Sequence, residues 1–469
     1  MTQASVRYNG LEYGPDWRHG VASCTKSVLS SLVGIAIQQG FIESIQQPML
    51  DFFPGRKIAN RDPRKEAITL EHLLTMSSGL HCIYNGFEKT LYDMRSSKHW
   101  AQFMLDQPMD YDPGTHFFYN SGASHLVSAI LTQATGQSAF EFASKHLFGP
   151  LGIQDVAWPS DPQGHTCGWG QLQLQPRDMA KFGYLFLCDG VCEGRRLVPP
   201  GWVAESTRFR FDPTRSQGYG LLWWLRSVPS KTGLRSVASE TGLRSAAPES
   251  GPRGIAAAQQ RGLEPSQWYF AAGIGVQVIA VAPAASLVCA VTGRTDEEDR
   301  EWVFRSLEEH VIGSAQTSVH PADPEGQRLL QAEIAAFAQP QPKQAPPQPA
   351  HAQEVSGRTY TLESNRLGWK TLAISFGAGS DVAQVSLNAS TPVPVGLDGV
   401  PRLTAEAERT LRSAWQAWWE GDAFVLDCDT LSQYRRYRLR LSFHGDGLAI
   451  SSHEYANGVD ERFAGRVAP

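Results

Sequence analysis

A serine and a lysine three residues apart, Ser23 and Lys26, stand at the start of an apolar stretch of the sequence. A serine hydroxyl becomes a good nucleophile only when a neighbouring base takes its proton. Residues three apart lie on one face of a helix, so Lys26 can reach Ser23 there. The free N–H groups at a helix N-terminus would also stabilise an oxyanion. The pair predicts acyl transfer through a serine; the alternative is a serine that caps the helix and a lysine in solvent.

The elements that must position this pair follow along the chain. Apolar residues recur at helical spacing from 25 to 39, and Gly40 is a typical C-terminal stop, which predicts a buried helix. Two apolar runs, at 268–282 and 287–292, predict an antiparallel hairpin. A further helix is expected after Asp296, which is a favoured N-cap residue. Helices before and after an antiparallel sheet indicate an α+β fold.

A change of composition divides the chain into two blocks. Residues 338–350 are rich in Pro, Gln and Ala and are expected to form an extended spacer. We therefore expect a first domain at 1–315, a connecting segment with one short helix at 316–354, and a second domain at 355–469. Within the first domain, the Ser- and Gly-rich residues 227–266 contain the repeat TGLRS twice and predict a surface insertion.

The second block has the alternating pattern of β-strands. Tyr437, Leu439 and Leu441 share one face of a strand, and arginines occupy the other face. We expect about six short strands separated by Gly and Asp turns, and hence a small all-β barrel or sandwich. The expected strands are at 358–362, 371–376, 382–387, 424–427, 436–443 and 448–451.

Composition and charge exclude several functions. The 469 residues carry 42 Lys and Arg against 47 Asp and Glu, so the net charge of −5 offers no footprint for nucleic acid. No segment approaches the about 18 apolar residues of a membrane span. Residues 1–20 lack the pattern of a signal peptide, and 7 cysteines are too few for a disulfide framework, so we expect a cytoplasmic location. Metal-binding spacings are absent from the sequence, and neither a metal nor an organic cofactor is expected.

Several further segments occur in an order that resembles the superfamily of serine β-lactamases and penicillin-binding proteins. They are LLTMSSGL at 73–80, PGTHFFYNSG at 113–122, PLGI at 150–153, PRDMA at 176–180 and YGLLWW at 219–224. The chain is most similar in appearance to the esterase-type and 6-aminohexanoate-oligomer-hydrolase-type members. The resemblance implies an antiparallel sheet flanked by helices with an all-helical subdomain. It also implies a longer N-terminal segment than the 22 residues that precede Ser23.

The resemblance assigns catalytic roles to residues that match the motifs of the superfamily. It implies that Ser23 is the nucleophile and that Lys26 activates it. Tyr119 would move protons between Ser23 and the leaving group, and we expect the neighbouring ammonium to ease the ionisation of its phenol. The backbone N–H groups of Ser23 and Ile274 would form the oxyanion hole.

Substrate contacts are expected at four further residues. By the resemblance, Ser121 holds the third position of the Tyr-x-Asn/Ser motif, and Gly273 precedes the second residue of the oxyanion hole. Trp169 and Tyr84 are aromatic residues that could line an apolar cleft for the substrate.

The third motif of the superfamily departs most from the usual pattern. Where β-lactamases carry Lys-Thr-Gly, the aligned strand has Ala271-Ala272-Gly273, and a Lys-Thr-Gly at 231–233 lies in the insertion. Without a cation, a substrate carboxylate loses a contact worth about 1.5–3 kcal/mol. We therefore expect a serine hydrolase of the carboxylesterase or amidase type, which cleaves small neutral esters or linear amides through an acyl-enzyme. The alternatives are a β-lactamase or D-peptidase, and a catalytically silent binding protein on the same fold.

Overall fold

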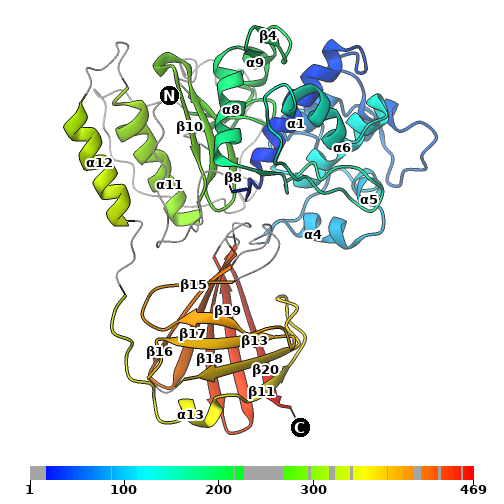
Figure 1. The fold of residues 1–469 in the computed structure, drawn as a ribbon. Coiled ribbons are helices and arrows are strands. Elements are labelled where there is room, and N and C mark those ends of the chain that lie inside the picture. The colour runs from blue at the N-terminus through cyan, green and yellow to red at the C-terminus, as the bar shows by residue number, and fades with distance from the viewer. Residues whose placement is uncertain are drawn as a thin grey trace. The chain divides into compact units, whose positions relative to one another are not determined.

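The computed structural model describes residues 17–85, 87–214, 217–226, 268–293, 297–315, 323–337, 342–377, 379–404, 413–430, 435–455 and 458–468. The chain divides into two compact units (Figure 1). The first unit lies within Gly20–Gly293 and Glu297–Val319, and the second within His320–Pro469. The expected insertion at 227–266, including its Lys-Thr-Gly, lies outside the described residues, as does Asp296.

The first unit is built around a six-stranded antiparallel sheet with the order β10-β9-β8-β7-β6-β5. Its strands are β5 (Phe211–Thr214), β6 (Gln217–Tyr219), β7 (Trp224–Arg226), β8 (Trp268–Gly273), β9 (Gln277–Ala282) and β10 (Leu287–Val291). The apolar run at 268–282 forms both β8 and β9, because the chain reverses at Gly275 and Val276, which have positive φ. The expected hairpin is therefore a three-stranded meander, whose first turn is concealed within a continuous apolar run.

Helices account for most of the regular secondary structure of the first unit outside this sheet. They are α1 (Cys24–Gln38), α2 (Pro63–Glu66), α3 (Leu70–Leu74), α4 (Lys89–Ser96), α5 (Trp100–Leu105), α6 (Ser121–Thr135), α7 (Ala139–Ala143), α8 (Pro176–Leu187), α9 (Trp202–Ser206) and α11 (Glu297–Ser306). α1 confirms the helix predicted at 25–39, and Gly40 has the left-handed backbone expected at its end. β1 (His19–Gly20) pairs with β2 (Gln173–Leu174) just before α1 begins.

The large sheet lies between two layers of helices (Figure 1). Trp268 and Phe270 of β8 pack against Phe304 of α11, whereas Tyr269 packs against Phe186 of α8. Because successive residues of a strand point to opposite faces of the sheet, α11 and α8 cover opposite faces. This layered arrangement is the predicted α+β fold.

The second unit is a β-barrel. Its ten strands follow the order β14-β13-β12-β11-β20-β19-β18-β17-β16-β15, and β14 also pairs in parallel with β16 through Gly396 and Gln416. This second pairing closes nine strands into a ring and leaves β15 beside β16. An odd number of strands in an otherwise antiparallel ring requires one parallel seam, which here is the β14–β16 pair. The strands are β11 (Thr359–Leu362), β12 (Thr371–Phe376), β13 (Val382–Leu387), β14 (Val393–Gly396), β15 (Arg402–Leu403), β16 (Ser413–Glu420), β17 (Ala423–Thr430), β18 (Arg435–His444), β19 (Gly447–Glu454) and β20 (Val459–Val467).

The all-β second domain is confirmed, but the predicted number of strands was too low. The six expected strands correspond to β11, β12, β13, β17, β18 and β19, and the missed strands are β14, β15, β16 and β20. In β16, Trp415 faces the barrel core, and Trp418 on the outer face stacks with Arg438 at 5.2 Å from the ring centroid. Tryptophans on both faces conceal the alternation by which a strand is recognised.

The segment between the two blocks contains the predicted short helix. α12 (Pro324–Phe337) is that helix, and α13 (Ala352–Val355) follows the Pro-rich residues. Ala352 and Val355 belong to the barrel core, and the N–H of Lys343 donates to Asp398 O at 2.8 Å. The chain from Lys343 onward therefore already packs on the barrel. Within the described part of the chain, no helix combines the length and apolar character needed to cross a membrane.

Candidate active site

Ser23 and Lys26 meet at the N-terminus of α1. Lys26 Nζ lies 2.9 Å from Ser23 Oγ and donates to the carbonyl oxygen of Trp169 at 2.6 Å. Lys26 is only 1% exposed, and its burial lowers the pKa to about 8, although the charge of Glu88 opposes this shift. Ser23 precedes the first helical residue but makes no capping hydrogen bond with its side chain. The alternative of a capping serine and a solvated lysine is therefore wrong.

The backbone before Ser23 is held in an unusual conformation. Ala22 has a φ of 45°, in the left-handed region that residues with a Cβ rarely adopt. The N–H of Val21 donates to Leu172 O at 2.8 Å, which ties this turn to β2 and its flank. Such strain at a non-glycine residue is typical of functional sites, where the surrounding structure enforces it.

Tyr119 lies in the loop just before α6, and its ring faces Lys26. The ring centroid of Tyr119 is 5.0 Å from Lys26 Nζ, and its ring stacks on Trp224 at 6.0 Å. Burial raises the pKa of the Tyr119 phenol well above its ordinary value, although a hydrogen bond with Ser23 opposes the rise. The expectation that the phenol ionises easily was wrong, because loss of hydration raises its pKa by more than the hydrogen bond with Ser23 lowers it. Tyr119 is therefore a neutral phenol in the resting site.

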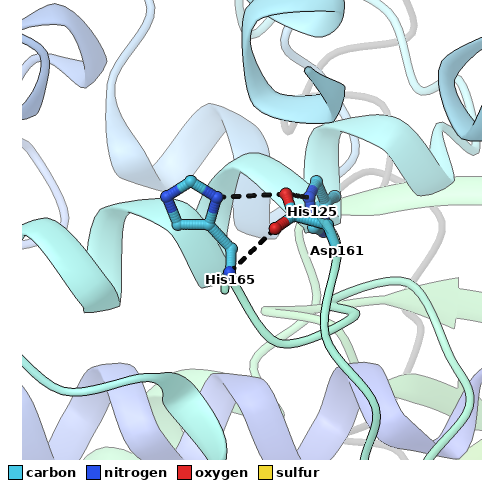
Figure 2. A group of neighbouring side chains, drawn as sticks. All are labelled: His125, Asp161 and His165. Atoms are coloured by element: carbon cyan, nitrogen blue, oxygen red, sulfur yellow. Dashed lines mark hydrogen bonds and ion pairs between the residues drawn. The ribbon is translucent and has the colours of Figure 1, made fainter. Parts of the chain in front are cut away.

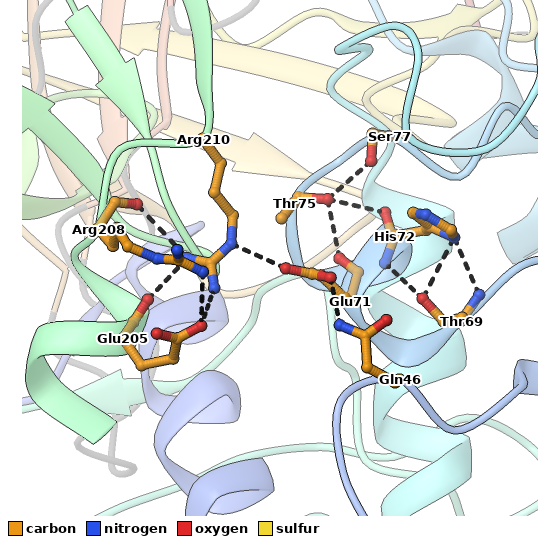
Figure 3. Close-up of polar contacts among 9 residues, drawn as sticks. All are labelled: Gln46, Thr69, Glu71, His72, Thr75, Ser77, Glu205, Arg208 and Arg210. Atoms are coloured by element: carbon orange, nitrogen blue, oxygen red, sulfur yellow. Dashed lines mark hydrogen bonds and ion pairs between the residues drawn. The ribbon is translucent and has the colours of Figure 1, made fainter. Parts of the chain in front are cut away.

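The LLTMSSGL segment holds Tyr119 in place. α3 begins with a capping box between Thr69 and His72, and Glu71 accepts from Arg210 Nε at 3.0 Å, as Figure 3 shows. The carbonyl of Met76 accepts from Phe118 N–H at 2.8 Å, and Met76 itself has a left-handed φ of 57°. The polar contacts of α3 thus fix a strained turn at Met76, whose carbonyl is hydrogen-bonded to the residue before Tyr119.

Glu88 is a site residue that the sequence analysis missed. Its carboxylate accepts from the N–H of Ser121 at 2.7 Å, at the N-terminus of α6. Burial raises the pKa of Glu88, whereas Ser121 and the positive charge of Lys26 act in the opposite direction. Ser121, predicted as a substrate contact, is buried and engages Glu88 through its backbone. The sequence gave no signal for this role, because Glu88 precedes α4 but binds the N-terminus of a different helix, α6.

The turn between β8 and β9 lies beside the nucleophile segment, as the oxyanion-hole prediction requires. A Cβ on Gly273 would fall 2.5 Å from Val21 O, so only glycine allows this approach. Cys24 Sγ donates to Gln277 O at 3.3 Å. The half-buried Ile274 lies between these two contacts in the chain.

Gln277 stabilises this turn and was also missed. Its side-chain amide donates to Gly275 O at 3.1 Å and to Gly293 O at 2.7 Å. Within the turn, Val276 has a left-handed φ of 64°. A glutamine within an apolar strand could have been recognised as a buried polar group that needs partners.

The two predicted aromatic contacts differ in the structure. Trp169 reaches the site through its carbonyl oxygen on Lys26, while its buried ring lies under the guanidinium of Arg95 at 5.3 Å. Tyr84 is 36% exposed and pairs with Glu88 through an isolated β-bridge. Contact of either ring with a substrate stays a prediction.

The structure has a β-lactamase-like hydrolase fold in which a buried lysine lies beside a serine. The sequence matches the Beta-lactamase family over residues 3–311. The chain therefore belongs to the Beta-lactamase family, and the predicted resemblance is confirmed.

Curated proteins resemble this chain over part of their length. The 6-aminohexanoate-dimer hydrolase of Paenarthrobacter ureafaciens is 25% identical over 213 residues, which are 43% of this chain and 54% of that protein. The lovastatin esterase of Penicillium rubens is 30% identical over 102 residues, 20% of this chain and 25% of that protein. An uncharacterised protein of Alkalihalophilus pseudofirmus is 25% identical over 245 residues, 48% of this chain and 65% of that protein. The chain thus spans less than two thirds of the length of these relatives.

Among solved structures, a putative 6-aminohexanoate-dimer hydrolase from Bacillus anthracis matches with a TM-score of 0.48 at 18% identity. The match covers 65% of this chain and 76% of that protein's chain. The octameric penicillin-binding protein homologue from Pyrococcus abyssi has a TM-score of 0.46 at 15% identity, with 97% and 89% coverage.

Proposed function

We propose that the chain is a serine hydrolase that cleaves neutral carboxylic esters or linear amides through an acyl-enzyme. The observation that carries the proposal is the contact between Ser23 Oγ and Lys26 Nζ, 2.9 Å apart, with the lysine pKa lowered to about 8. A lysine that is partly unprotonated near neutral pH can act as a general base.

In the acylation step, neutral Lys26 takes the proton of Ser23 as its oxygen attacks the substrate carbonyl. The N–H groups of Ser23 and Ile274 stabilise the oxyanion. Tyr119, a neutral phenol, donates its proton to the leaving alcohol or amine and is reprotonated from the Lys26 ammonium. Water then attacks the acyl group along the reverse route, releases the acid and restores Ser23.

The choice of neutral substrates rests on β8. Ala271, at the position of the lysine in the third β-lactamase motif, is fully buried in the core. A methyl group there offers no partner to a substrate carboxylate. Relatives named as a 6-aminohexanoate-dimer hydrolase and a lovastatin esterase support amides and esters as the bonds cleaved.

Labelling with a fluorophosphonate tests the proposal. Intact mass should show one adduct per chain, and peptide mapping should locate it on Ser23, since only an activated serine reacts. A protein that is folded but unlabelled would favour the silent binding protein instead. A label on a serine other than Ser23 would refute the assigned nucleophile.

A further inference from the structure

Three buried side chains of the first unit form a cluster that the proposed reaction does not use. His125 of α6 and His165 each place a ring nitrogen 3.0 Å from Asp161 Oδ2, as Figure 2 shows. The side chains of His125 and Asp161 are fully buried and that of His165 is nearly so. The backbone N–H groups of Gln163 and His165 donate to Asp161 Oδ1 at 2.8 and 2.9 Å.

These ligand types would suit a zinc ion, but the hydrogen bonds already explain their arrangement. A carboxylate offers about four lone-pair positions. Two backbone N–H groups and two imidazoles occupy them in Asp161. Burial opposes the charge of Asp161, yet the hydrogen bonds from both histidines hold its pKa well below the ordinary value. Burial lowers the pKa of His125, which therefore acts as a neutral imidazole.

A neutral His125 that donates from Nε2 must accept at Nδ1. Nδ1 of His125 accepts from the N–H of Gly168 at the long distance of 3.4 Å. Close packing supports this contact, because a Cβ on Gly168 would fall 2.3 Å from Ser124 O of α6. Asp161 thus selects the tautomer of His125 whose Nδ1 can accept the hydrogen bond from the Gly168 N–H.

Residues 165–169, here called the anchored segment, are fixed at every position. Ser128 Oγ of α6 donates to Thr166 O at 2.6 Å. Trp158 Nε1 donates to Cys167 O at 2.9 Å. The last residue of the segment, Trp169, accepts from Lys26 Nζ at 2.6 Å. The segment therefore runs directly from the buried cluster to the proposed base.

This last contact bears on catalysis because a neutral amine has two hydrogens and one lone pair. When one N–H of Lys26 is given to the Trp169 carbonyl, rotation about the Cε–Nζ bond is restricted. The lone pair can then remain directed at Ser23 Oγ, 2.9 Å away. A displaced carbonyl would leave the amine free to rotate, and fewer encounters would have the geometry for proton transfer.

We propose that His125, oriented by Asp161, is a positioning residue that sets the aim of Lys26 through the backbone of Gly168 and Trp169, from the N–H of Gly168 to the carbonyl of Trp169. This inference rests on the proposed function, in which Lys26 is the base.

Two substitutions in the cluster separate this role from a purely structural one. His125→Gln can still donate to Asp161 from its amide but has no acceptor at the former Nδ1 position. His165→Asn keeps a donor near Nδ1 and never touched Gly168. We expect kcat, counted per fluorophosphonate-reactive Ser23, to fall about tenfold in His125→Gln with KM within about twofold. In His165→Asn, kcat should stay within about threefold of the wild type.

A matched pair in α6 keeps the test decisive if the histidine variants do not fold. Ser128→Ala removes the hydroxyl that holds Thr166 O, and Ser124→Ala removes a hydroxyl that donates to Ser121 O at 3.1 Å inside the helix. Both serines are fully buried and lose the same atom. We expect kcat to fall about threefold or more in Ser128→Ala alone, with KM unchanged.

Wild-type kcat in a folded His125→Gln variant would overturn the inference, as would a loss in Ser124→Ala equal to that in Ser128→Ala. If His125→Gln does not fold, wild-type kcat in Ser128→Ala would overturn it. Stoichiometric zinc in the purified protein, measured by elemental analysis and lost in the His165 variant, would overturn it in favour of a metal site. Failure of the wild type to react with the fluorophosphonate would instead refute the proposed function.

Discussion

The candidate active site and the barrel bury ionisable side chains in opposite ways. In the barrel, Asp427 is buried and accepts from Arg436 at 2.9 Å and from Arg438 at 2.8 Å. Burial works against its charge, but the two guanidinium groups hold its pKa below the ordinary value. In the first unit, buried Lys26 and partly buried Glu88 hydrogen-bond neutral groups, and burial shifts the pKa of each toward its uncharged form.

This difference separates a structural charge from a chemical one. A buried charge with a direct counter-ion keeps its charge at every physiological pH and contributes to the fold. A buried group without one can gain or lose a proton near neutral pH, which is what a general base requires. The comparison predicts that changes around Lys26 alter rate, whereas changes around Asp427 alter stability.

The largest expected effect is that of Ser23→Ala. Hydrolysis of a nitrophenyl butyrate should fall at least about 1,000-fold, because the nucleophile is removed. The melting temperature should stay close to that of the wild type, since Ser23 makes no capping bond. A variant that keeps most of the wild-type rate would show that another group attacks the ester.

The next effect concerns the charge of the substrate. Because Ala271 replaces a cation, kcat/KM for nitrophenyl butyrate should exceed that for a chromogenic cephalosporin by at least about tenfold, or about 1.4 kcal/mol. Both rates should be measured on one preparation at one pH. Equal or faster turnover of the cephalosporin would favour the β-lactamase alternative. Arg300, whose charge acts on Tyr119, would then be the cation to replace.

A smaller effect is expected in the pH profile. For the wild type, kcat/KM should rise with pH through an apparent pKa of about 8, as Lys26 loses its proton. The Glu88 carboxylate favours the ammonium form, so Glu88→Gln should lower this pKa, move the rise to lower pH and increase kcat/KM at pH 7 about threefold. Glu141→Gln is the matched control. Glu141 also accepts from a backbone N–H, that of Ser138, and its pKa is lowered by its hydrogen bonds with Ser138 and not by contact with Lys26. A rise that stays in place or moves to higher pH would contradict the role given to Glu88.

The smallest effect on rate is expected in the barrel. Asp427→Asn should leave ester hydrolysis unchanged but lower the free energy of unfolding by about 1–3 kcal/mol, since two arginines lose their carboxylate. Glu420→Gln removes a half-exposed carboxylate from Arg440 and should lower the free energy of unfolding far less, because solvent screens this ion pair. Urea titrations of the full chain would measure both. A loss of activity in the Asp427 variant without a loss of stability would break the comparison.

Local pattern was enough to predict the elements that carry the chemistry. The spacing of Ser23 and Lys26 and the periodicity of α1 are properties of one short segment, and the structure joins the two side chains. The alternating β18 was likewise visible in the sequence, because one face is apolar and the other is charged.

Features that depend on distant contacts could not be predicted in this way. Glu88 joins the site because its loop folds onto the N-terminus of α6, 33 residues away in the sequence. The pKa of Tyr119 was expected to fall, since its amine neighbour was foreseen but its loss of hydration was not. The β8–β9 turn needed Val276 in a left-handed conformation, which no propensity favours.

The left-handed backbone of Ala22, Met76 and Val276 limits how this protein can be improved. Each such residue withholds about 1–2 kcal/mol from the folded state, and glycine at the same position would recover part of it. Selection for thermal stability would therefore favour glycine at these three positions. Glycine would also loosen the alignment of the nucleophile, of Tyr119 and of the oxyanion turn. At these positions, a higher free energy of unfolding is therefore expected to come with slower turnover.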